Sequence, residues 1–152
     1  MSSRFSYARN PEAIQPLNAL ATYVRSSGLE PGLIELVLMR ASQLNGCAYC
    51  LDMHSQDARA AGETEQRLYL LQAWRETPFY NVRERAALAW CEAVTVLDPR
   101  HGVPDEVYEQ ARTVFSEREL MDLNLAVVMI NGWNRIAIPT RAEPGHYRPG
   151  SH

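Results

Sequence analysis

Apolar residues recur along this chain at intervals of three and four, which is the spacing of one face of an α-helix. The pattern predicts an all-α fold, a compact bundle of six to seven helices. No internal repeat or linker divides the chain, so we expect one domain over residues 1–152, with its core at about 16–139. The tail at 140–152 is expected to be loose or to lie on a neighbouring subunit. The expected helices are residues 11–26, 31–45, 47–61, 64–77, 83–97 and 104–115, and a seventh between Ser116 and Pro139.

Three local signals set helix boundaries. Asn10 is a good N-cap for the first helix. Ser116 and Glu119 have the spacing of a capping box and start the last one. Asn45-Gly46 is a strong turn pair, which predicts a hairpin between the second and third helices.

Two of the expected helices are apolar on almost every side. Residues 33–39 contain one charged residue, Glu35, and residues 125–130 contain none. The second run alone could be a buried strand, but the cap before it and the lack of a partner strand favour a helix. One such helix fits the core of a 152-residue chain, whereas two favour a homo-oligomer.

The composition narrows the class of protein. The chain is 46% hydrophobic and 22% charged, which is ordinary for a globular domain, and its net charge of −3 argues against nucleic acid as the main partner. No apolar run approaches the roughly 20 residues of a membrane span. The first residues lack the apolar core of a signal peptide, so we expect a cytoplasmic location.

The candidate chemistry begins with the cysteines. Three cysteines are too few for a secreted disulfide framework, and Cys91 has the pattern of a small core residue. Cys47 and Cys50 form a Cys-x-x-Cys pair after a turn and at a helix start, where backbone N–H groups and the helix dipole favour a thiolate. Since the two sulfurs lie about one turn apart, one can attack a substrate and the other can close a disulfide.

Two further residues extend this pair into a proton relay. His54 follows Cys50 by four residues on the same helix face, so its imidazole can accept the thiol proton. We therefore expect Cys50 to be the attacking thiol and Cys47 the resolving one. Burial is expected to raise the pKa of Glu35 toward the range useful for proton transfer. A hairpin about residues 45–46 places Glu35 and His54 at matching depth.

Simpler interpretations exist for each residue. The cysteine pair could be structural or half of a zinc site, with His54 as a third ligand and no evident fourth. Glu35 could simply pair with Arg40 or another cation. The four residues together, at these spacings, are much harder to explain as coincidence.

The spacing also resembles a known signature. It is that of the alkyl hydroperoxidase D-like (AhpD-like) group of the carboxymuconolactone decarboxylase superfamily, and the segment at 130–137 resembles the end of that domain in one branch. The resemblance covers roughly residues 16–139. The matching positions are Glu35-x6-Ser42-x2-Asn45-x-Cys47-x-Tyr49-Cys50-x3-His54.

The resemblance implies an all-helical domain that assembles as a trimer or hexamer and acts as a dithiol peroxidase or disulfide reductase. It implies that Glu35 and His54 relay a proton from Cys50. It also implies no cofactor besides the cysteine pair, no metal, and an external thiol or lipoyl-type electron donor. Tyr49 stands where the best-known members, which act beside a peroxiredoxin, have a histidine.

These observations predict a thiol-dependent peroxidase of antioxidant defence. Tyr49, Ser42, Trp133 and Asn134 are expected to line its substrate pocket. One alternative is a non-catalytic redox-sensing or zinc-binding module. Another is a small-molecule enzyme like the carboxymuconolactone decarboxylases, whose branch does not depend on a cysteine pair.

Overall fold

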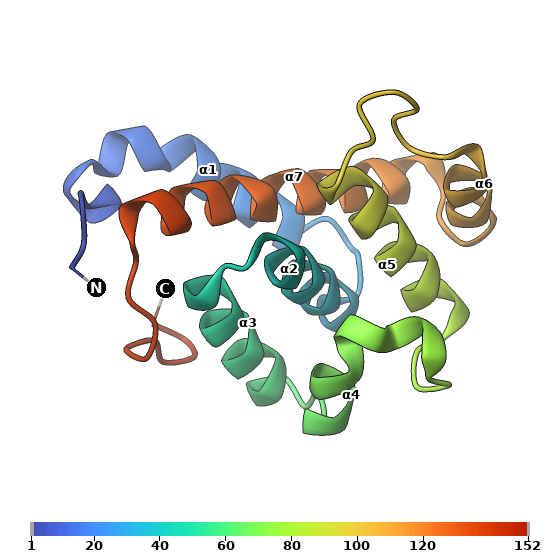
Figure 1. Ribbon diagram of the computed structural model, residues 1–152, viewed down its shortest axis with the longest axis horizontal. Coiled ribbons are helices and arrows are strands. Elements are labelled where there is room, and N and C mark those ends of the chain that lie inside the picture. The colour runs from blue at the N-terminus through green and yellow to red at the C-terminus, as the bar shows by residue number, and fades with distance from the viewer. Residues whose placement is uncertain (1, 152) are drawn as a thin grey trace.

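A computed structural model describes residues 2–151 and confirms the all-α fold (Figure 1). Outside its helices, this part of the chain has one isolated β-bridge, between Asp98 and Gly102. None of its helices has the length and hydropathy that crossing a membrane requires. The helices are η1 (Tyr7–Arg9), α1 (Pro11–Arg25), α2 (Pro31–Asn45), α3 (Ala48–Ala60), α4 (Glu65–Leu70), η2 (Leu71–Glu76), α5 (Val82–Thr95), α6 (Asp105–Val114) and α7 (Glu117–Thr140).

The boundaries differ from the sequence prediction in small ways. Asn10 occupies the N-cap position of α1, but its side chain donates a hydrogen bond to the Ser6 carbonyl instead of capping the helix. The fourth expected helix is divided into α4 and η2, which meet at Leu70 and Leu71, and η2 is itself kinked at Ala73. Pro139 lies inside α7, one residue before its end; it lacks the N–H that would continue the helix hydrogen bonds, and the helix stops at the next residue.

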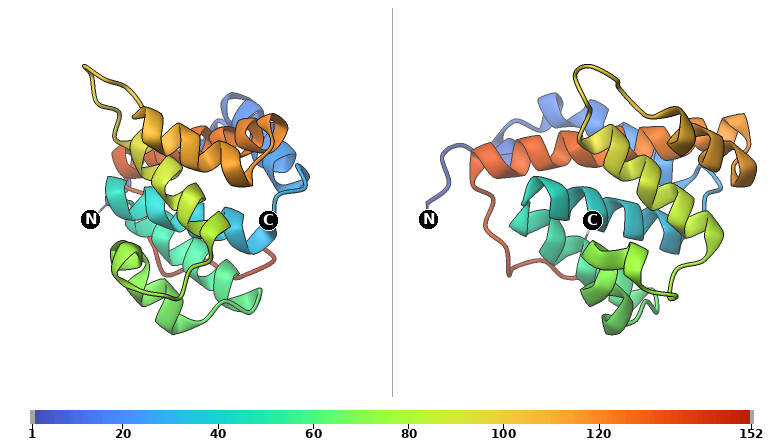
Figure 2. Two further views of the ribbon diagram at one scale, coloured as in Figure 1. Left: turned by 90° about the vertical axis from the view of Figure 1, so that its right-hand side faces the viewer. Right: turned by 45° about the vertical axis from the view of Figure 1, so that its right-hand side comes forward.

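Helix α2 occupies the centre of the molecule and packs against α3, α5 and α7 (Figures 1 and 2). All residues from 33 to 39 are buried, including Glu35, which is why this segment is apolar on nearly every side. The run at 125–130 is helical, as predicted, and forms the middle of α7. Within it Val128 is exposed, so this helix is buried on fewer sides than α2.

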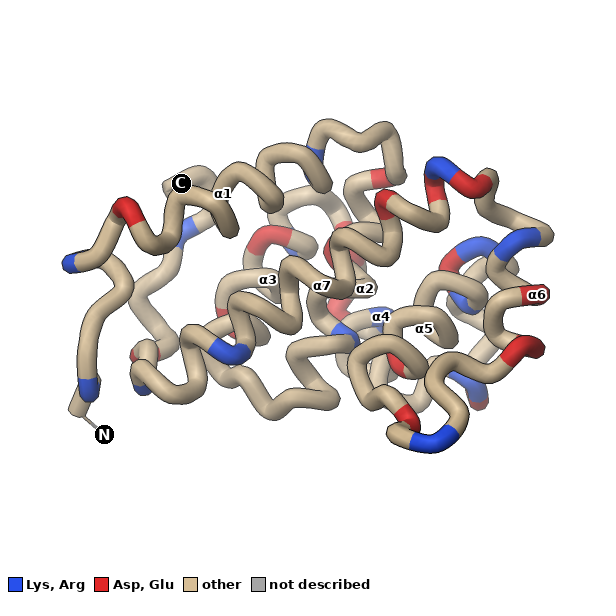
Figure 3. Tube along the Cα trace, turned by 90° about the horizontal axis from the view of Figure 1, so that it is seen from above, with Lys and Arg blue, Asp and Glu red and all other residues tan. Residues whose placement is uncertain are grey.

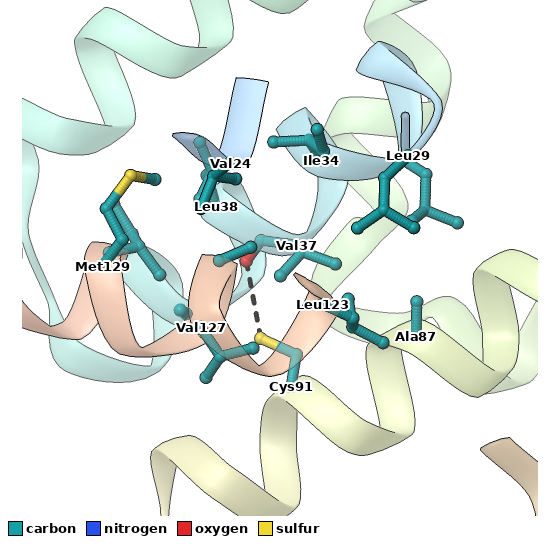
Figure 4. Close-up of a cluster of buried hydrophobic side chains, with 14 of the residues drawn as sticks. Val24, Leu29, Ile34, Val37, Leu38, Ala87, Cys91, Leu123, Val127 and Met129 are labelled. Carbon is teal, nitrogen blue, oxygen red and sulfur yellow. Dashed lines mark hydrogen bonds between the residues drawn. The ribbon is translucent and has the colours of Figure 1, made fainter. Parts of the chain in front are cut away.

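The predicted core role of Cys91 is confirmed. Its side chain is fully buried between α5, α2 and α7, and its thiol donates to the Val37 carbonyl across 3.4 Å (Figure 4). Leu123 and Val127 of α7 pack in the same cluster. Burial raises the pKa of the Cys91 thiol to about 12, so this cysteine is un-ionised at neutral pH.

The turn between α2 and α3 fixes the geometry of the site. Gly46 ends α2 in the left-handed conformation (φ 68°), which side-chain-bearing residues rarely adopt. The chain then reverses, and Cys47 becomes the N-cap residue of α3. The hairpin predicted from Asn45-Gly46 is therefore present, with α3 packed along α2.

The segment after α7 turns back onto the same chain (Figures 1 and 2). The Gly145 N–H donates to Asp52 Oδ2 (2.7 Å), and the Tyr147 hydroxyl donates to Asp57 Oδ1 (2.6 Å). The expectation of a loose tail is thus wrong for this stretch. Acidic side chains on the outer face of α3 supply acceptors that the composition of the tail did not reveal.

Charged residues lie mainly around the periphery, with basic and acidic positions interleaved (Figure 3). All 15 basic residues apart from histidine are arginines. Several join separate elements: Arg67 pairs with Glu63 and Glu84, and Arg83 pairs with Glu30 and Glu119. These forked contacts fasten α4 to α5 and α5 to α7 at the surface.

Candidate active site

The two thiols meet at the start of α3. Cys47 Sγ accepts a hydrogen bond from the Cys50 backbone N–H across 3.4 Å, so the sulfur itself caps the helix. Both residues are free thiols, and each is only 1% exposed. The predicted position of the pair at a helix N-terminus is present in the structure.

The environment makes the two thiols unequal. A hydrogen bond from the Cys50 thiol, with further ones from the Cys50 backbone and Asn134, lowers the pKa of Cys47 to about 7 although burial opposes this. The same contact with Cys47, together with burial, raises the pKa of Cys50. Cys47 is therefore the thiol that ionises first. This is the reverse of the order expected from the nearness of Cys50 to His54 along the helix.

Glu35 and His54 are brought together as predicted. His54 Nδ1 lies 3.1 Å from Glu35 Oε2, and both side chains are buried. Arg25 of α1 donates from Nη1 to Glu35 Oε1 across 2.7 Å. Arg40, the cation considered from the sequence, pairs with Glu92 instead.

The expected rise in the pKa of Glu35 is wrong. Burial does push it upward, but the hydrogen bond and charge of His54 and the charge of Arg25 outweigh burial, so the pKa lies below its ordinary value. Arg25 adds to the larger effect of His54. It lies ten residues before Glu35 on another helix, and no sequence spacing pointed to it.

His54 forms no hydrogen bond with either sulfur within residues 2–151. Its position four residues after Cys50 on α3 nevertheless places both side chains on one face of that helix. Because Glu35 holds Nδ1, the ring nitrogen left for proton exchange is Nε2.

Ser42 and Asn134, expected in a substrate pocket, belong instead to a buried polar network. Asn134 is fully buried, donates from Nδ2 to Ser42 Oγ (3.1 Å) and accepts from Asn45 Nδ2 (2.8 Å). Asn45 also donates to Asn131 Oδ1. Since Asn134 also lowers the pKa of both thiols, this network supports the dithiol from the α7 side.

Tyr49 and Trp133 are half-buried and pack against the core cluster that contains both cysteines. A third aromatic residue, Tyr7 of η1, joins them: its hydroxyl donates to the Tyr49 hydroxyl across 3.3 Å, and its ring meets the Trp133 ring edge-on at 6.1 Å. Sequence reasoning missed Tyr7, because it lies some forty residues before the motif without a characteristic spacing.

The comparisons with known proteins agree with this arrangement. The model of the carboxymuconolactone decarboxylase family matches residues 11–93, more than half of the chain. The chain belongs to this family. Within it, the chain is AhpD-like, since the fold and the cysteine pair at the start of α3 match that group.

Individual relatives match most of the length of this chain. The uncharacterized protein YdfG of Bacillus subtilis is 45% identical over 139 residues, which are 91% of this chain and 94% of that protein. A crystal structure from Agrobacterium tumefaciens, of a protein of unknown function suggested to be the antioxidant defence protein AhpD, has a TM-score of 0.91 at 43% identity and covers 96% of this chain and 100% of that one. The debrominase Bmp8 shares the fold, with a TM-score of 0.81 at 19% identity over 91% of this chain and 74% of that one.

The positions of the possible metal-ligand side chains test whether the cysteine pair belongs to a zinc site. Among residues 2–151, the group of three possible ligand side chains whose donor atoms lie within 4.8 Å of one another is Glu35, His54 and Asp57. Cys47, Cys50 and His54 do not form such a group. Arg25 already supplies a positive charge to Glu35, and Tyr147 donates to Asp57. These contacts favour a proton relay over a cation site.

A cavity of about 330 Å³ borders the relay rather than the thiols. Its lining includes Gly32 and Glu35 of α2, Ala58 near the end of α3, and Glu63. None of the four residues predicted for the substrate pocket lies in it. The relay therefore opens toward one end of α3, while the thiols lie at the other end.

Proposed function

We propose that this protein is a thiol-dependent peroxidase that cycles between the Cys47–Cys50 dithiol and a disulfide. The observation that carries the proposal is the ionisable Cys47 thiol at the start of α3, hydrogen-bonded to Cys50, which lies four residues before His54 of the buried Glu35–His54 pair. A thiolate is the form of cysteine that attacks peroxides, and a neighbouring thiol one turn away converts the product into a disulfide.

The first step belongs to Cys47. Its thiolate attacks one peroxide oxygen, so an S–O bond forms and the O–O bond breaks. The sulfur is oxidised to sulfenic acid, and the peroxide is reduced to an alcohol or water that takes one proton from solvent. This proton replaces the one released when Cys47 ionised, so the charges balance.

The second step belongs to Cys50 and the relay. The Cys50 thiol gives its proton to His54, whose imidazolium is stabilised by Glu35, and attacks the Cys47 sulfur. The S–S bond forms, the S–O bond breaks, and the departing hydroxide takes the proton back from His54 as water. An external dithiol then reduces the disulfide.

Cysteine variants treated with one equivalent of hydrogen peroxide test both steps. Cys50→Ser is expected to gain one oxygen atom on Cys47, trapped as a sulfenic acid adduct and located by mass spectrometry, without further turnover. Cys47→Ser is expected to react at the rate of a free thiol. The opposite pattern would establish Cys50 as the attacking thiol, as the helical spacing predicted. Peroxide consumption at the wild-type rate by both variants would overturn the proposal.

We propose that the protein binds no cofactor for this cycle, because the dithiol itself stores the two electrons. The electron donor is an external thiol or a lipoyl-type dithiol, and the cytoplasm, which keeps thiols reduced, is the compartment that fits. Turnover with dihydrolipoamide compared with glutathione distinguishes the two donors. Retention of a decarboxylase-type activity after replacement of both cysteines would favour the small-molecule enzyme instead.

We further propose a homo-oligomer, a trimer or hexamer as the AhpD-like resemblance implies. Met121, Val128 and Ile138 of α7 are large apolar side chains that a single copy leaves exposed. Light scattering is expected to give a multiple of 17.2 kDa, and a mass equal to that of one chain would contradict this proposal.

A further inference from the structure

A short segment ahead of α1 lies next to the dithiol and has no role in the steps above. It comprises residues 3–9 and ends in η1. The Arg4 backbone N–H donates to the Thr140 carbonyl (3.1 Å), and Ser3 Oγ donates to the same oxygen (3.4 Å). These bonds hold the segment against the end of α7, the helix that carries Trp133 and Asn134.

Tyr7 is the residue of this segment that faces the site. Its hydroxyl bonds to that of Tyr49, the residue between the two cysteines, and its ring contacts Trp133. Burial and the bond with Tyr49 raise the pKa of the Tyr7 hydroxyl, and the Cys50 sulfur adds a smaller electrostatic contribution in the same direction.

The burial pattern shows what the segment does. Phe5, two residues earlier, is 55% exposed, whereas Tyr7 is turned inward and half-buried. Beneath the three aromatic residues, each cysteine is only 1% exposed. A peroxide therefore reaches either sulfur only after local movement of the side chains that cover it, and a small peroxide needs less movement than a bulky one.

We propose that residues 3–9 form a cover over the dithiol and that Tyr7 is its specificity-determining residue, admitting hydrogen peroxide more readily than bulky organic hydroperoxides. The contacts that hold Tyr7 are one neutral hydrogen bond and one edge-on ring contact, each modest in strength. Such a cover opens by local motion without unfolding the bundle. The substrate preference rests on the proposed peroxidase function, but access to the thiols does not.

Alkylation of the reduced full-length protein tests access alone. Tyr7→Ala is expected to speed the reaction of Cys47 and Cys50 with the bulky reagent N-phenylmaleimide about tenfold or more, because both contacts of the cover are lost. The rate with the small reagent iodoacetamide is expected to increase much less. Tyr7→Phe, which keeps the ring and loses the bond to Tyr49, should fall between. Mass spectrometry assigns the label to each cysteine, with buried Cys91 as an internal reference.

Phe5→Ala is the matched control, since it removes an exposed aromatic side chain from the same segment. It is expected to leave both rates unchanged. Equal rates in Tyr7→Ala and the wild type, or an equal gain for both reagents, would overturn the proposal, the latter because it indicates general loosening. Circular dichroism verifies that each variant is folded.

The peroxide preference is measured next as the ratio of the rates with cumene hydroperoxide and hydrogen peroxide. Tyr7→Ala is expected to raise this ratio about fivefold or more relative to the wild type, by removal of the same contacts. If this ratio is unchanged while maleimide labelling is faster, Tyr7 limits access to the thiols but does not determine the peroxide preference. Absence of turnover in every variant, with labelling still controlled by Tyr7, would overturn the peroxidase function and not the cover.

Discussion

Glu35 Oε2 lies 3.1 Å from His54 Nδ1, while the other oxygen of the same carboxylate accepts from Arg25 at 2.7 Å. Three helices, α1, α2 and α3, thus supply one chain of charged groups, which is buried at Glu35 and His54 and reaches solvent at Arg25. His54 and Arg25 keep the carboxylate ionised, and the carboxylate in turn orients the imidazole ring. In the proposed cycle Glu35 acts on the dithiol through His54 and is a positioning residue.

Replacement of Glu35 by glutamine tests this relationship. The variant keeps the shape of the side chain and removes the charge that stabilises the His54 imidazolium. Peroxide turnover is expected to fall by about tenfold to a thousandfold, the range of a lost acid–base contribution. The free energy of unfolding is expected to fall by about 1–3 kcal/mol, because the bond from Arg25 is weakened.

Glu92→Gln is the matched control for Glu35→Gln. Glu92 is a largely buried carboxylate that pairs with Arg40 and accepts from Trp74, away from the thiols. The Glu92→Gln variant is expected to lose as much stability as Glu35→Gln and to keep its peroxide turnover. Equal losses of activity in the two variants would show that Glu35 acts only by stabilising the fold.

The thiolate of Cys47 gives a prediction in pH. With a pKa of about 7, against an ordinary thiol value of about 8.5, Cys47 is about 90% ionised at pH 8. Ultraviolet absorbance of the reduced protein is expected to show one thiolate titrating near pH 7. Cys47→Ser should abolish this step, while Cys91→Ser should leave it, because Cys91 stays un-ionised there.

The same shift affects stability. Since the folded-state pKa of Cys47 lies below that of the unfolded chain, the unfolded chain binds more protons between about pH 7 and pH 8.5. The free energy of unfolding is expected to rise with pH in this window, and the contribution is lost as pH falls through 7. The raised pKa of Cys50 makes the free energy of unfolding fall with pH, but only at pH values above the ordinary pKa of a thiol. Chemical denaturation at several pH values, with Cys47→Ser as reference, measures the slope.

Much of this site could be predicted from local spacing. The cysteine pair and His54 lie on one helix, and Glu35 is joined to them by a tight hairpin, so the helix period and one turn fixed their arrangement. The all-α fold followed from the same periodicity. These features share the property that their partners lie within about twenty residues.

Contacts between separate helices, other than across the tight hairpin, could not be predicted. Arg25 lies only ten residues before Glu35 but on another helix, and it helps His54 to lower the pKa of Glu35. Tyr7 lies far from the motif yet contacts Tyr49. The bond from Tyr147 to Asp57 spans ninety residues. Such pairings depend on how helices pack, which a period along one helix does not encode.

The bond between Tyr147 and Asp57 predicts the behaviour of the tail. Tyr147→Phe removes the hydroxyl that donates across 2.6 Å and is expected to increase amide hydrogen exchange in residues 141–151, with a stability loss of about 1 kcal/mol. Tyr69→Phe, at a tyrosine that is 71% exposed on α4, is the control and should change neither quantity. Unchanged exchange in the tail of Tyr147→Phe would show that other contacts hold this segment.

Asn134 links the stability of the core to the reactivity of the dithiol. Asn134→Ala removes the donor to Ser42 Oγ and one of the two acceptors of the Asn45 amide in a buried network, so the free energy of unfolding is expected to fall by about 1–3 kcal/mol. Because the Asn134 side chain also lowers the pKa of Cys47, its thiolate should titrate at higher pH than in the wild type. Asn131→Ala is the control, because it removes an acceptor of the same Asn45 amide but no contact that changes the pKa of a thiol. The free energy of unfolding should therefore fall while Cys47 titrates at the same pH as in the wild type. A Cys47 titration that moves equally in both variants would assign the effect to loosening of α7 rather than to the Asn134 amide.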